Sequence, residues 1–200
     1  TFIGTVSPAG GNLKEPVTES TKKAARCFYA LSQNRADSKR YPAIDTLDSY
    51  SKYLEYPECI DYSKEKLDEN WVGLVNEARN ILVRGKETEE QINILGDDSV
   101  PIDYHVTLWK SEFVDFVILQ QDAFDKIDAT TSLERQEFML KKVINVTRSE
   151  FKFEGFEEVG TYFKRLINVF RQMNYTVFKS EEFHKVEEEA NAVLEERIIK

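Results

Sequence analysis

The clearest hydrophobic pattern in the chain is a helical stripe in its last quarter. Apolar side chains recur three and four residues apart at Val159, Tyr162, Phe163, Leu166, Ile167, Phe170 and Met173. This spacing places them on one face of an α-helix that is buried against neighbouring elements. Asn174 and Tyr175 interrupt the stripe. Ser180 is a suitable N-cap for a last helix, whose inward face is predicted to be Phe183, Val186, Ala190, Val193 and Leu194.

A second amphipathic pattern fills the stretch from residue 63 to residue 85. Its apolar positions are Leu67, Trp71, Leu74, Val75, Ala78, Ile81 and Leu82. Ser63 is a suitable N-cap and Gly85 a suitable stop, because glycine tolerates the backbone that ends helices. Residues 87–95 then predict a separate short helix, which Gly96 stops.

Two further helices are predicted in the middle of the chain. Asp97, Asp98 and Ser99 precede Pro101, an order typical of a helix start. The apolar face of that helix is Val106, Trp109, Phe113, Phe116 and Val117. Thr131 and Glu134 match a capping box for the next helix. That helix carries Leu140, Val143 and Ile144 inward, so residues 54–200 predict a helical bundle.

The first fifty residues follow a different pattern. Residues 2–6 are rich in β-branched and aromatic side chains, as in a strand, and residues 8–12 predict a loop. A short helix follows, capped by Thr18 or Thr21. Cys27–Leu31 fits a buried strand, although a helix is also compatible with so short a run. Residues 32–39 predict one or two helical turns, which Pro42 stops. We therefore predict a mainly α fold in which residues 1–53 form a small α/β remnant of a parallel sheet.

Composition narrows the class of protein. The 200 residues suffice for one domain or one domain and a piece, and the chain opens without methionine, as if cut from a larger protein. A formal net charge of −9 disfavours a nucleic-acid binder, because phosphates require a basic surface. Two cysteines cannot build a disulfide framework, which favours a reducing, cytoplasmic compartment. No apolar run reaches the ~20 residues of a membrane span, so neither a membrane span nor a signal peptide is predicted.

Taken alone, the chemistry-bearing residues indicate no enzyme. Gly10 and Gly11 lack the rest of the phosphate-binding pattern G-x-x-x-x-G-K-S/T, and no metalloprotease, nucleophile-elbow or C-x-x-C motif occurs. The histidines and cysteines have no metal-ligand spacing, so no metal site is predicted. Asp45 and Asp48 lie beside a proline turn, where carboxylates cap backbone amides more often than they act as acid and base.

The remaining notable side chains have ordinary structural interpretations. Trp71 and Trp109 lie on apolar stripes and are predicted core residues. His105 and His184 lie at polar or boundary positions and are predicted surface residues. The acidic run at residues 187–189 is predicted to be a solvated helix face.

Three blocks of the sequence are distinctive. They are residues 6–18 (Val-Ser-Pro-Ala-Gly-Gly-Asn-Leu-Lys-Glu-Pro-Val-Thr), residues 41–51 and residues 119–125. Together they resemble the catalytic A subunit, or alpha chain, of the vacuolar/archaeal-type rotary ATPases. Residues 6–18 are similar to the family's Val-Ser-Pro-Pro-Gly-Gly-Asp-Phe-Ser-Glu-Pro-Val-Thr. Residues 41–51 (Tyr-Pro-Ala-Ile-Asp-Thr-Leu-Asp-Ser-Tyr-Ser) resemble its Phe-Pro-Ala-Ile-Asn-Trp-Leu-x-Ser-Tyr-Ser. Residues 119–125 (Leu-Gln-Gln-Asp-Ala-Phe-Asp) resemble its Leu-Gln-Gln-Asn-Ala-Phe-Asp, and residues 134–136 occupy the place of Glu-Lys-Gln. The resemblance covers most of this chain but only the C-terminal part of the family's protein.

The resemblance implies the end of a nucleotide-binding α/β domain in residues 1–53 and a helical bundle domain in residues 54–200. For the whole subunit it implies hydrolysis or synthesis of ATP with Mg²⁺, coupled to proton or sodium transport. The family's phosphate-binding loop, catalytic glutamate and magnesium-holding residues would lie upstream, so this chain is expected to hold no catalytic residue. The implied partners are neighbouring B subunits in an alternating hexamer and a central stalk. The implied location is the cytoplasmic face of a membrane, without membrane insertion.

The resemblance also implies an adenine site. In the family, two aromatic rings hold the base, one from the Phe-Pro-Ala-Ile block and one from the Gln-Asn-Ala-Phe turn. The corresponding residues are Tyr41 and Phe124, with Pro42 and Gln121 as weaker candidates. An aromatic ring that stacks on a base contributes ~1–3 kcal/mol.

Departures from the family pattern imply a looser adenine pocket. Asp122 replaces an asparagine and adds negative charge near an anionic ligand, while Ala129 and Thr130 replace a threonine and a tyrosine. One alternative for Phe124 is a plug at the end of the bundle core. An alternative for the whole chain is a non-catalytic helical protein-interaction module with acidic faces.

Overall fold

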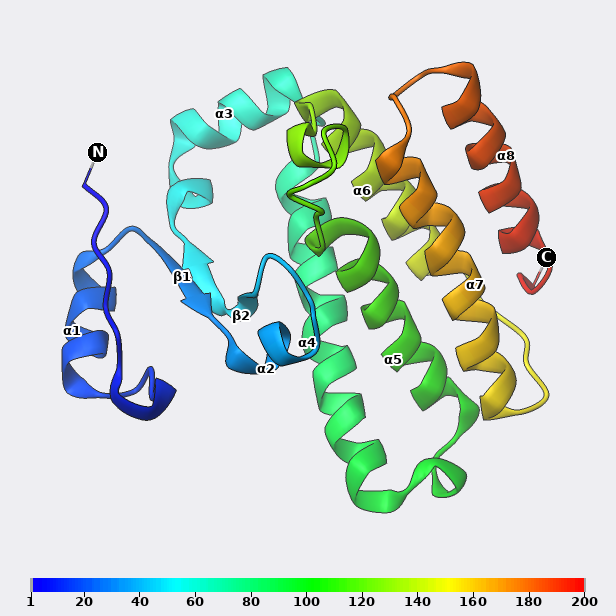
Figure 1. Cartoon of the computed structure of the whole chain (residues 1–200), viewed down its shortest axis with the longest axis horizontal. Helices are drawn as coiled ribbons and strands as arrows, with labels where there is room; N and C mark the ends of the chain where they lie inside the picture. The colour runs from blue at the N-terminus through cyan, green and yellow to red at the C-terminus, as the bar shows by residue number, and fades with distance from the viewer. Residues whose placement is uncertain (1, 200) are drawn as a thin grey trace. The chain divides into compact units, whose positions relative to one another are not determined.

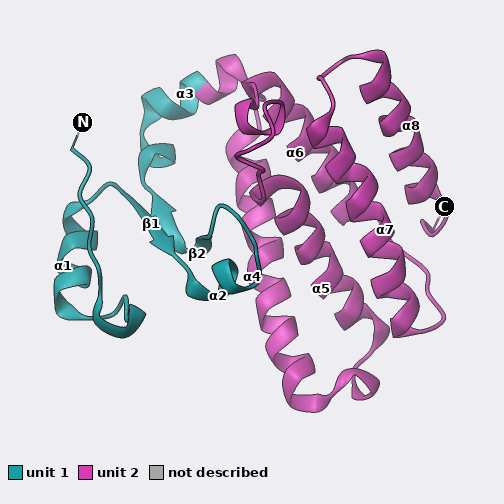
Figure 2. Cartoon of the chain, in the orientation of Figure 1, with its two compact units in different colours: residues 1–62 teal, residues 63–200 magenta. Residues whose placement is uncertain are grey.

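The structure is a computed structural model that describes residues 2–199. The chain divides into two compact units, residues 1–62 and residues 63–200, which Figure 2 shows in teal and magenta. We call them the N-terminal unit and the helical unit. The boundary falls inside helix α3 (Pro57–Lys66).

The N-terminal unit contains a small antiparallel sheet. Strand β1 (Cys27–Leu31) pairs with strand β2 (Ile44–Ser51), and the register places Phe28 opposite Tyr50 and Leu31 opposite Ile44. Helix α2 (Gln33–Asp37) lies between the two strands in sequence, and helix α1 (Pro16–Ala24) precedes them (Figure 1). Two short 3₁₀ turns complete the unit, η1 (Ala9–Gly11) and η2 (Tyr53–Glu55).

The sheet differs from the predicted one. The strand at Cys27–Leu31 is confirmed, but it is not a buried one, because Tyr29 and Leu31 are exposed. Its partner is β2, which the sequence did not reveal, and the pairing is antiparallel. Residues 2–6 have no regular secondary structure, so the strand predicted there is wrong, and no parallel sheet occurs within residues 2–199. A strand-like sequence forms a strand only where a neighbour accepts and donates its backbone hydrogen bonds.

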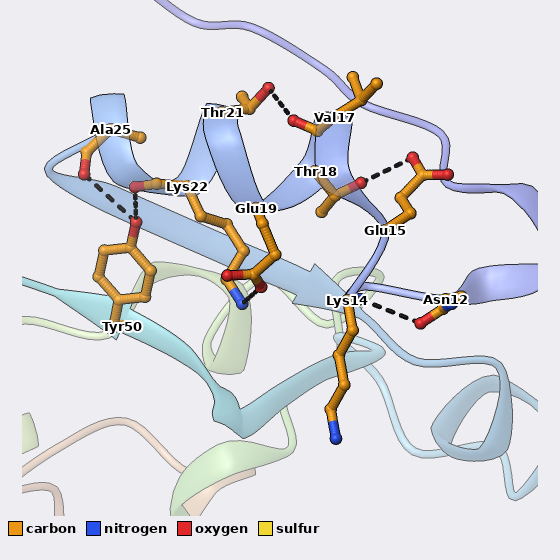
Figure 3. Close-up of polar contacts among 10 residues, drawn as sticks. All are labelled: Asn12, Lys14, Glu15, Val17, Thr18, Glu19, Thr21, Lys22, Ala25 and Tyr50. Carbon is orange, nitrogen blue, oxygen red and sulfur yellow. Dashed lines mark hydrogen bonds and ion pairs between the residues drawn. The ribbon is translucent and has the colours of Figure 1, made fainter.

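Tyr50 ties the end of α1 to the sheet of the N-terminal unit. Its hydroxyl lies within hydrogen-bonding distance of the carbonyl oxygens of Lys22 and Ala25 (Figure 3). At the start of the helix, the buried Thr18 hydroxyl donates to the Glu15 carboxylate at 2.9 Å. The helix begins at Pro16, earlier than predicted, because proline suits the first helical position, where no amide hydrogen is needed.

The helical unit is built from four long helices and a shorter one (Figure 1). They are α4 (Trp71–Leu95), α5 (Ile102–Val114), α6 (Leu133–Arg148), α7 (Phe156–Tyr175) and α8 (Glu181–Glu195). Helix α5 packs against α4 and α7, α7 also packs against α8, and α6 contacts α4. The π-helical turn η4 (Asp115–Leu119) continues α5, and the 3₁₀ turns η3 (Asp97–Ser99) and η5 (Asp128–Thr130) precede α5 and α6.

The core of the helical unit lies where the sequence predicted it. Every member of the α7 stripe is buried, and the rings of Phe113, Phe163, Phe170 and Phe183 are almost completely enclosed. Burial of one such side chain contributes ~1.5–3 kcal/mol, so this core dominates the stability of the unit. Trp71 and Trp109 pack against the core clusters as predicted. Ser180 caps α8 by accepting a hydrogen bond from Phe183 N.

Helix α4 begins later and ends later than predicted. Ser63 lies within α3 and does not cap α4, and Gly85 and residues 87–95 belong to one continuous helix that Gly96 ends. Gly85 is buried at a close approach of α4 to α5, where an added Cβ would lie 2.1 Å from Ser111 Cβ. Glycine is therefore required there for packing between helices and not for ending one.

Two smaller predictions in the helical unit are also wrong. His105 is buried, because its Nε2 reaches the Asp97 carbonyl oxygen at 3.1 Å and its ring stacks on Phe156. The cap of α6 is Ser132, one residue after the predicted Thr131. Glu134 pairs with Lys179 instead of completing a capping box.

Candidate functional site

The candidate site in the helical unit is the polar connection between α5 and α6, residues 120–132, which we call the Phe124 turn. It begins where η4 ends and the backbone becomes extended at Gln120. Asn174, at the end of α7, donates its side-chain amide to the Val117 carbonyl oxygen at 2.9 Å. The hydrogen-bond pattern of a π-helical turn differs from that of an α-helix. The hydrogen bond from Asn174 fixes the backbone of η4, from which the Phe124 turn departs.

Aspartate side chains organise the backbone of the Phe124 turn. Asp122 Oδ1 accepts a hydrogen bond from Phe124 N at 2.9 Å. Asp125 Oδ1 accepts from both Ile127 N and Asp128 N at 2.8 Å. Each carboxylate thus satisfies amides two or three residues later, which is how aspartate stabilises tight turns. The turn therefore has a defined conformation without regular secondary structure.

Asp128 connects the beginning of the turn to its end. Its Oδ2 accepts a hydrogen bond from Asp122 N at 2.6 Å, and its carbonyl oxygen accepts from Gln121 Nε2 at 2.6 Å and from Thr131 Oγ1 at 3.0 Å. Burial raises the pKa of the Asp128 carboxyl, while the hydrogen bond from Asp122 and the positive charge of Arg135 act in the opposite direction. Arg135 is itself buried and donates to the Met173 carbonyl oxygen of α7.

The side chain at the tip of this network is Phe124. Its ring is 97% exposed, whereas Phe is among the residues most often buried. Phe124 therefore does not plug the end of the bundle core. Gln121, also exposed, shares the same turn, so the structure brings these two predicted site residues together. An exposed aromatic ring on a braced turn is able to stack on a flat ligand.

The other two predicted site residues adjoin each other in the N-terminal unit. Tyr41 is 55% exposed, and its hydroxyl lies 3.4 Å from the Ala36 carbonyl oxygen of α2. Pro42 follows through a cis peptide bond and is also exposed. Asp45, at the start of β2, caps Leu47 N and Asp48 N, which confirms its predicted structural role. Tyr41 and Phe124 belong to different units.

Neither metal nor membrane features accompany these residues. Within residues 2–199, no group of three or more histidine, cysteine, aspartate or glutamate side chains is arranged to hold a metal ion. In the same part of the chain, no helix combines the length and apolarity that a membrane crossing requires. Tyr41 and Phe124 each present an exposed ring face that can stack, and the Tyr41 hydroxyl can also form hydrogen bonds.

Comparison with known protein families matches both units. Residues 1–51 match the nucleotide-binding domain of the ATP synthase alpha/beta family, and residues 61–154 match the C-terminal domain of V and A type ATP synthase. The chain belongs to the V-type ATP synthase alpha-chain family. It aligns with the C-terminal portion of that family's protein, so the resemblance noted in the sequence is confirmed.

Individual V-type relatives align along nearly all of the chain. The V-type ATP synthase alpha chain of Borrelia duttonii is 40% identical over 190 residues, which cover 94% of this chain and 30% of the relative. That of Chlamydia pneumoniae is 36% identical over 199 residues, which cover 100% of this chain and 33% of the relative. The chain therefore spans about a third of the length of these curated relatives. The solved ATP synthase subunit NeqB from Nanoarcheaum equitans is similar in fold, with a TM-score of 0.50 and 20% identity over 70% of this chain and 33% of that one.

Two residues that hold the Phe124 turn, Asp128 and Arg135, are not apparent from the sequence. The sequence predicts no role for Asp128, and Arg135 lies within residues 134–136, which occupy the place of the family's Glu-Lys-Gln. Their burial, at 6% and 3% exposure, is what distinguishes them. Charged residues are almost never so buried unless they are paired or hydrogen-bonded. No local sequence pattern reveals that burial. For Arg135, the Met173 carbonyl oxygen that accepts its hydrogen bond lies 38 residues away.

Proposed function

We propose that the chain contributes to the ATP-hydrolysing or ATP-synthesising catalytic subunit of a V-type rotary ATPase. Its membership of the alpha-chain family and its match to a nucleotide-binding domain model support this proposal. The subunit uses ATP or ADP with Mg²⁺, couples nucleotide turnover to ion transport, and alternates with B subunits around a central stalk. It acts on the cytoplasmic face of the membrane. Phosphate and magnesium chemistry belongs to parts of the subunit outside this chain.

Within that subunit, Tyr41 and Phe124 stack on the adenine ring, with Pro42 and Gln121 as additional contacts. The observation that carries this assignment is the exposure of Phe124 at 97% on a turn held by three aspartate side chains. A ring that must meet a ligand has to be exposed, and a fixed backbone lowers the entropy lost on binding. Residues 1–53 are the end of the nucleotide-binding α/β domain in this proposal, and residues 54–200 are the bundle domain.

The bundle transmits nucleotide-dependent movement to the central stalk. Such transmission requires that nucleotide bind one conformer of the subunit more tightly than another. The contacts of α7 to both sides of the Phe124 turn, through Val117 and Arg135, provide a physical connection from the turn into the bundle.

Replacing Phe124 in the full-length subunit, assembled in its complex, tests the proposal. Phe124→Ala removes one stacking surface, worth ~1–3 kcal/mol, so the KM for ATP should rise about 5- to 150-fold. Phe124→Tyr keeps the ring and should stay close to wild type. Steady-state ATPase assays and ADP binding measurements give both values. An unchanged KM for ATP and an unchanged ADP affinity in Phe124→Ala would show that Phe124 is not part of the adenine site. If the wild-type complex bound no nucleotide, the alternative that this chain is a non-catalytic interaction module would be favoured.

A further inference from the structure

We propose that Asp128 is a positioning residue, which holds the backbone of the Phe124 turn and thereby the Phe124 ring in the geometry that meets the base. This inference rests on the proposed function, since it presumes that Phe124 contacts adenine. It concerns a residue that makes no contact with the ligand itself. Its role is to prepare the turn before nucleotide arrives.

Three hydrogen bonds on Asp128 close the turn around Phe124. The donors Asp122 N and Gln121 Nε2 come from residues before the aromatic ring, and Thr131 Oγ1 comes from a residue after it. The carboxylate and the carbonyl of one residue therefore fasten both ends of the segment that carries Phe124. Without the carboxylate, the Asp122 amide would lose its acceptor, and the Asp122 side chain that receives Phe124 N would lose its support.

The Phe124 turn contains both a buried residue that holds its backbone and an exposed ring that is free to contact a ligand. Asp128 is 6% exposed, while Phe124, four residues earlier, is 97% exposed. A buried carboxylate costs free energy unless charge and hydrogen bonds compensate it. The Asp122 amide supplies a hydrogen bond and Arg135 supplies the compensating charge, while Arg135 is itself held by the Met173 carbonyl oxygen. Such a costly arrangement is expected where a single backbone geometry has to be maintained.

The experiment compares two ligands in the full-length subunit assembled in its complex. MgADP reports contacts to both base and phosphates, whereas magnesium pyrophosphate reports the phosphate contacts alone. Asp128→Ala and the milder Asp128→Asn are measured with Phe124→Ala, the double variant Asp128→Ala/Phe124→Ala, and the control Asp98→Ala. Asp98 is an exposed aspartate of η3 in the same unit, so its variant accounts for the loss of one carboxylate.

We expect Asp128→Ala to raise the Kd for MgADP about fivefold, as for the loss of one hydrogen bond, and to leave the Kd for magnesium pyrophosphate unchanged. Asp128→Asn retains an acceptor oxygen and should lie between Asp128→Ala and wild type. The double variant should bind MgADP no more weakly than Phe124→Ala alone, because residues that act through one contact are not additive. Asp98→Ala should match wild type with both ligands.

Each of the other outcomes overturns a defined claim. If Phe124→Ala weakens MgADP binding while Asp128→Ala and Asp128→Asn do not, Asp128 is not a positioning residue, and the proposed function stands. If Phe124→Ala has no effect, the adenine contact fails and this inference fails with it. Equal weakening of MgADP and pyrophosphate by both Asp128 variants, with a lower Tm, would show a general structural role. Should Asp128→Ala not assemble, Asp128→Asn alone decides among these outcomes.

Discussion

Gly85 shows how a single missing side chain sets the distance between two helices. It lies inside the 25-residue helix α4, where a glycine costs helix stability of up to about 1 kcal/mol relative to alanine. The close approach of Ser111 on α5 explains its presence, since an added Cβ would overlap both Ser111 Cβ and Oγ at 2.1 Å. Contact with α5 therefore outweighs the propensity of α4 at this position.

We predict that Gly85→Ala destabilises the protein despite the better helix propensity of alanine. Overpacking of this kind costs about 1–3 kcal/mol, and the gain in propensity recovers at most about 1 kcal/mol of it. Chemical denaturation of wild type and variant measures the difference in their free energies of unfolding. The comparison requires that this free energy fall with denaturant concentration at the same slope in both proteins. The double variant Gly85→Ala/Ser111→Gly exchanges the positions of the Cβ atoms and should recover part of the loss. A single variant as stable as wild type would mean that α4 and α5 separate at no cost.

At the scale of elements, α4 and α6 are connected by an ion pair as well as by apolar packing. The Arg148 guanidinium donates two hydrogen bonds to the Glu77 carboxylate, at 2.8 and 2.6 Å. The hydrogen bond from Arg148 is the main cause that lowers the pKa of Glu77, with its positive charge adding to the effect. Two-point contacts of this kind fix orientation more strongly than single ones.

The Glu77–Arg148 pair should give a defined pH dependence of stability. Because the pKa of Glu77 is lower in the folded state, the pair stabilises the fold above the ordinary pKa of glutamate and loses this effect as the pH falls through the lowered value. The Tm difference between wild type and Glu77→Gln should therefore be largest near neutral pH and shrink toward acid pH. Glu87→Gln, an exposed carboxylate elsewhere on α4, serves as the control. A difference independent of pH would show that the carboxylate charge contributes nothing.

Local periodicity predicted the helices well and the sheet poorly. The α7 stripe is buried as predicted because the residues that define the pattern are also the residues that pack. Strand β2 begins three residues after Tyr41 and mixes polar and apolar side chains, and only its pairing with β1 makes it a strand. The burial of His105 likewise depends on Phe156, which is distant in sequence.

For the candidate site, the sequence predicted Phe124 and its turn through family blocks, but it did not predict how the turn is held. The side chains of Asp122 and Asp125 accept hydrogen bonds from amides within three residues, and aspartate commonly does this in turns. The contribution of Asp128 depends on its burial, and that of Arg135 on its burial and its contact with Met173 of α7, neither of which a linear pattern contains.

At the scale of the whole molecule, the division into units agrees with the division between family matches. The nucleotide-binding match ends at residue 51 and the C-terminal-domain match begins at residue 61, while the compact units meet between residues 62 and 63. The helical unit contains both clusters of buried apolar side chains found among the described residues. The N-terminal unit has a two-stranded sheet, and sheets of this size are marginally stable without further packing. Most of the stability of the isolated chain should therefore reside in the helical unit.

The lack of a phosphate-binding pattern in this sequence predicts how the chain behaves alone. No G-x-x-x-x-G-K-S/T pattern occurs in its 200 residues, so binding would rest on aromatic stacking without phosphate contacts. Stacking of a few kcal/mol corresponds to a Kd of about 1 mM or weaker, since 1 mM is about 4 kcal/mol. We therefore expect no ATPase activity in phosphate-release assays and at most millimolar ADP binding by calorimetry. Adenosine should bind about as well as ADP, because the phosphates have no partner here. Turnover of ATP, or ADP binding far tighter than that of adenosine, would mean that residues of this chain recognise phosphate.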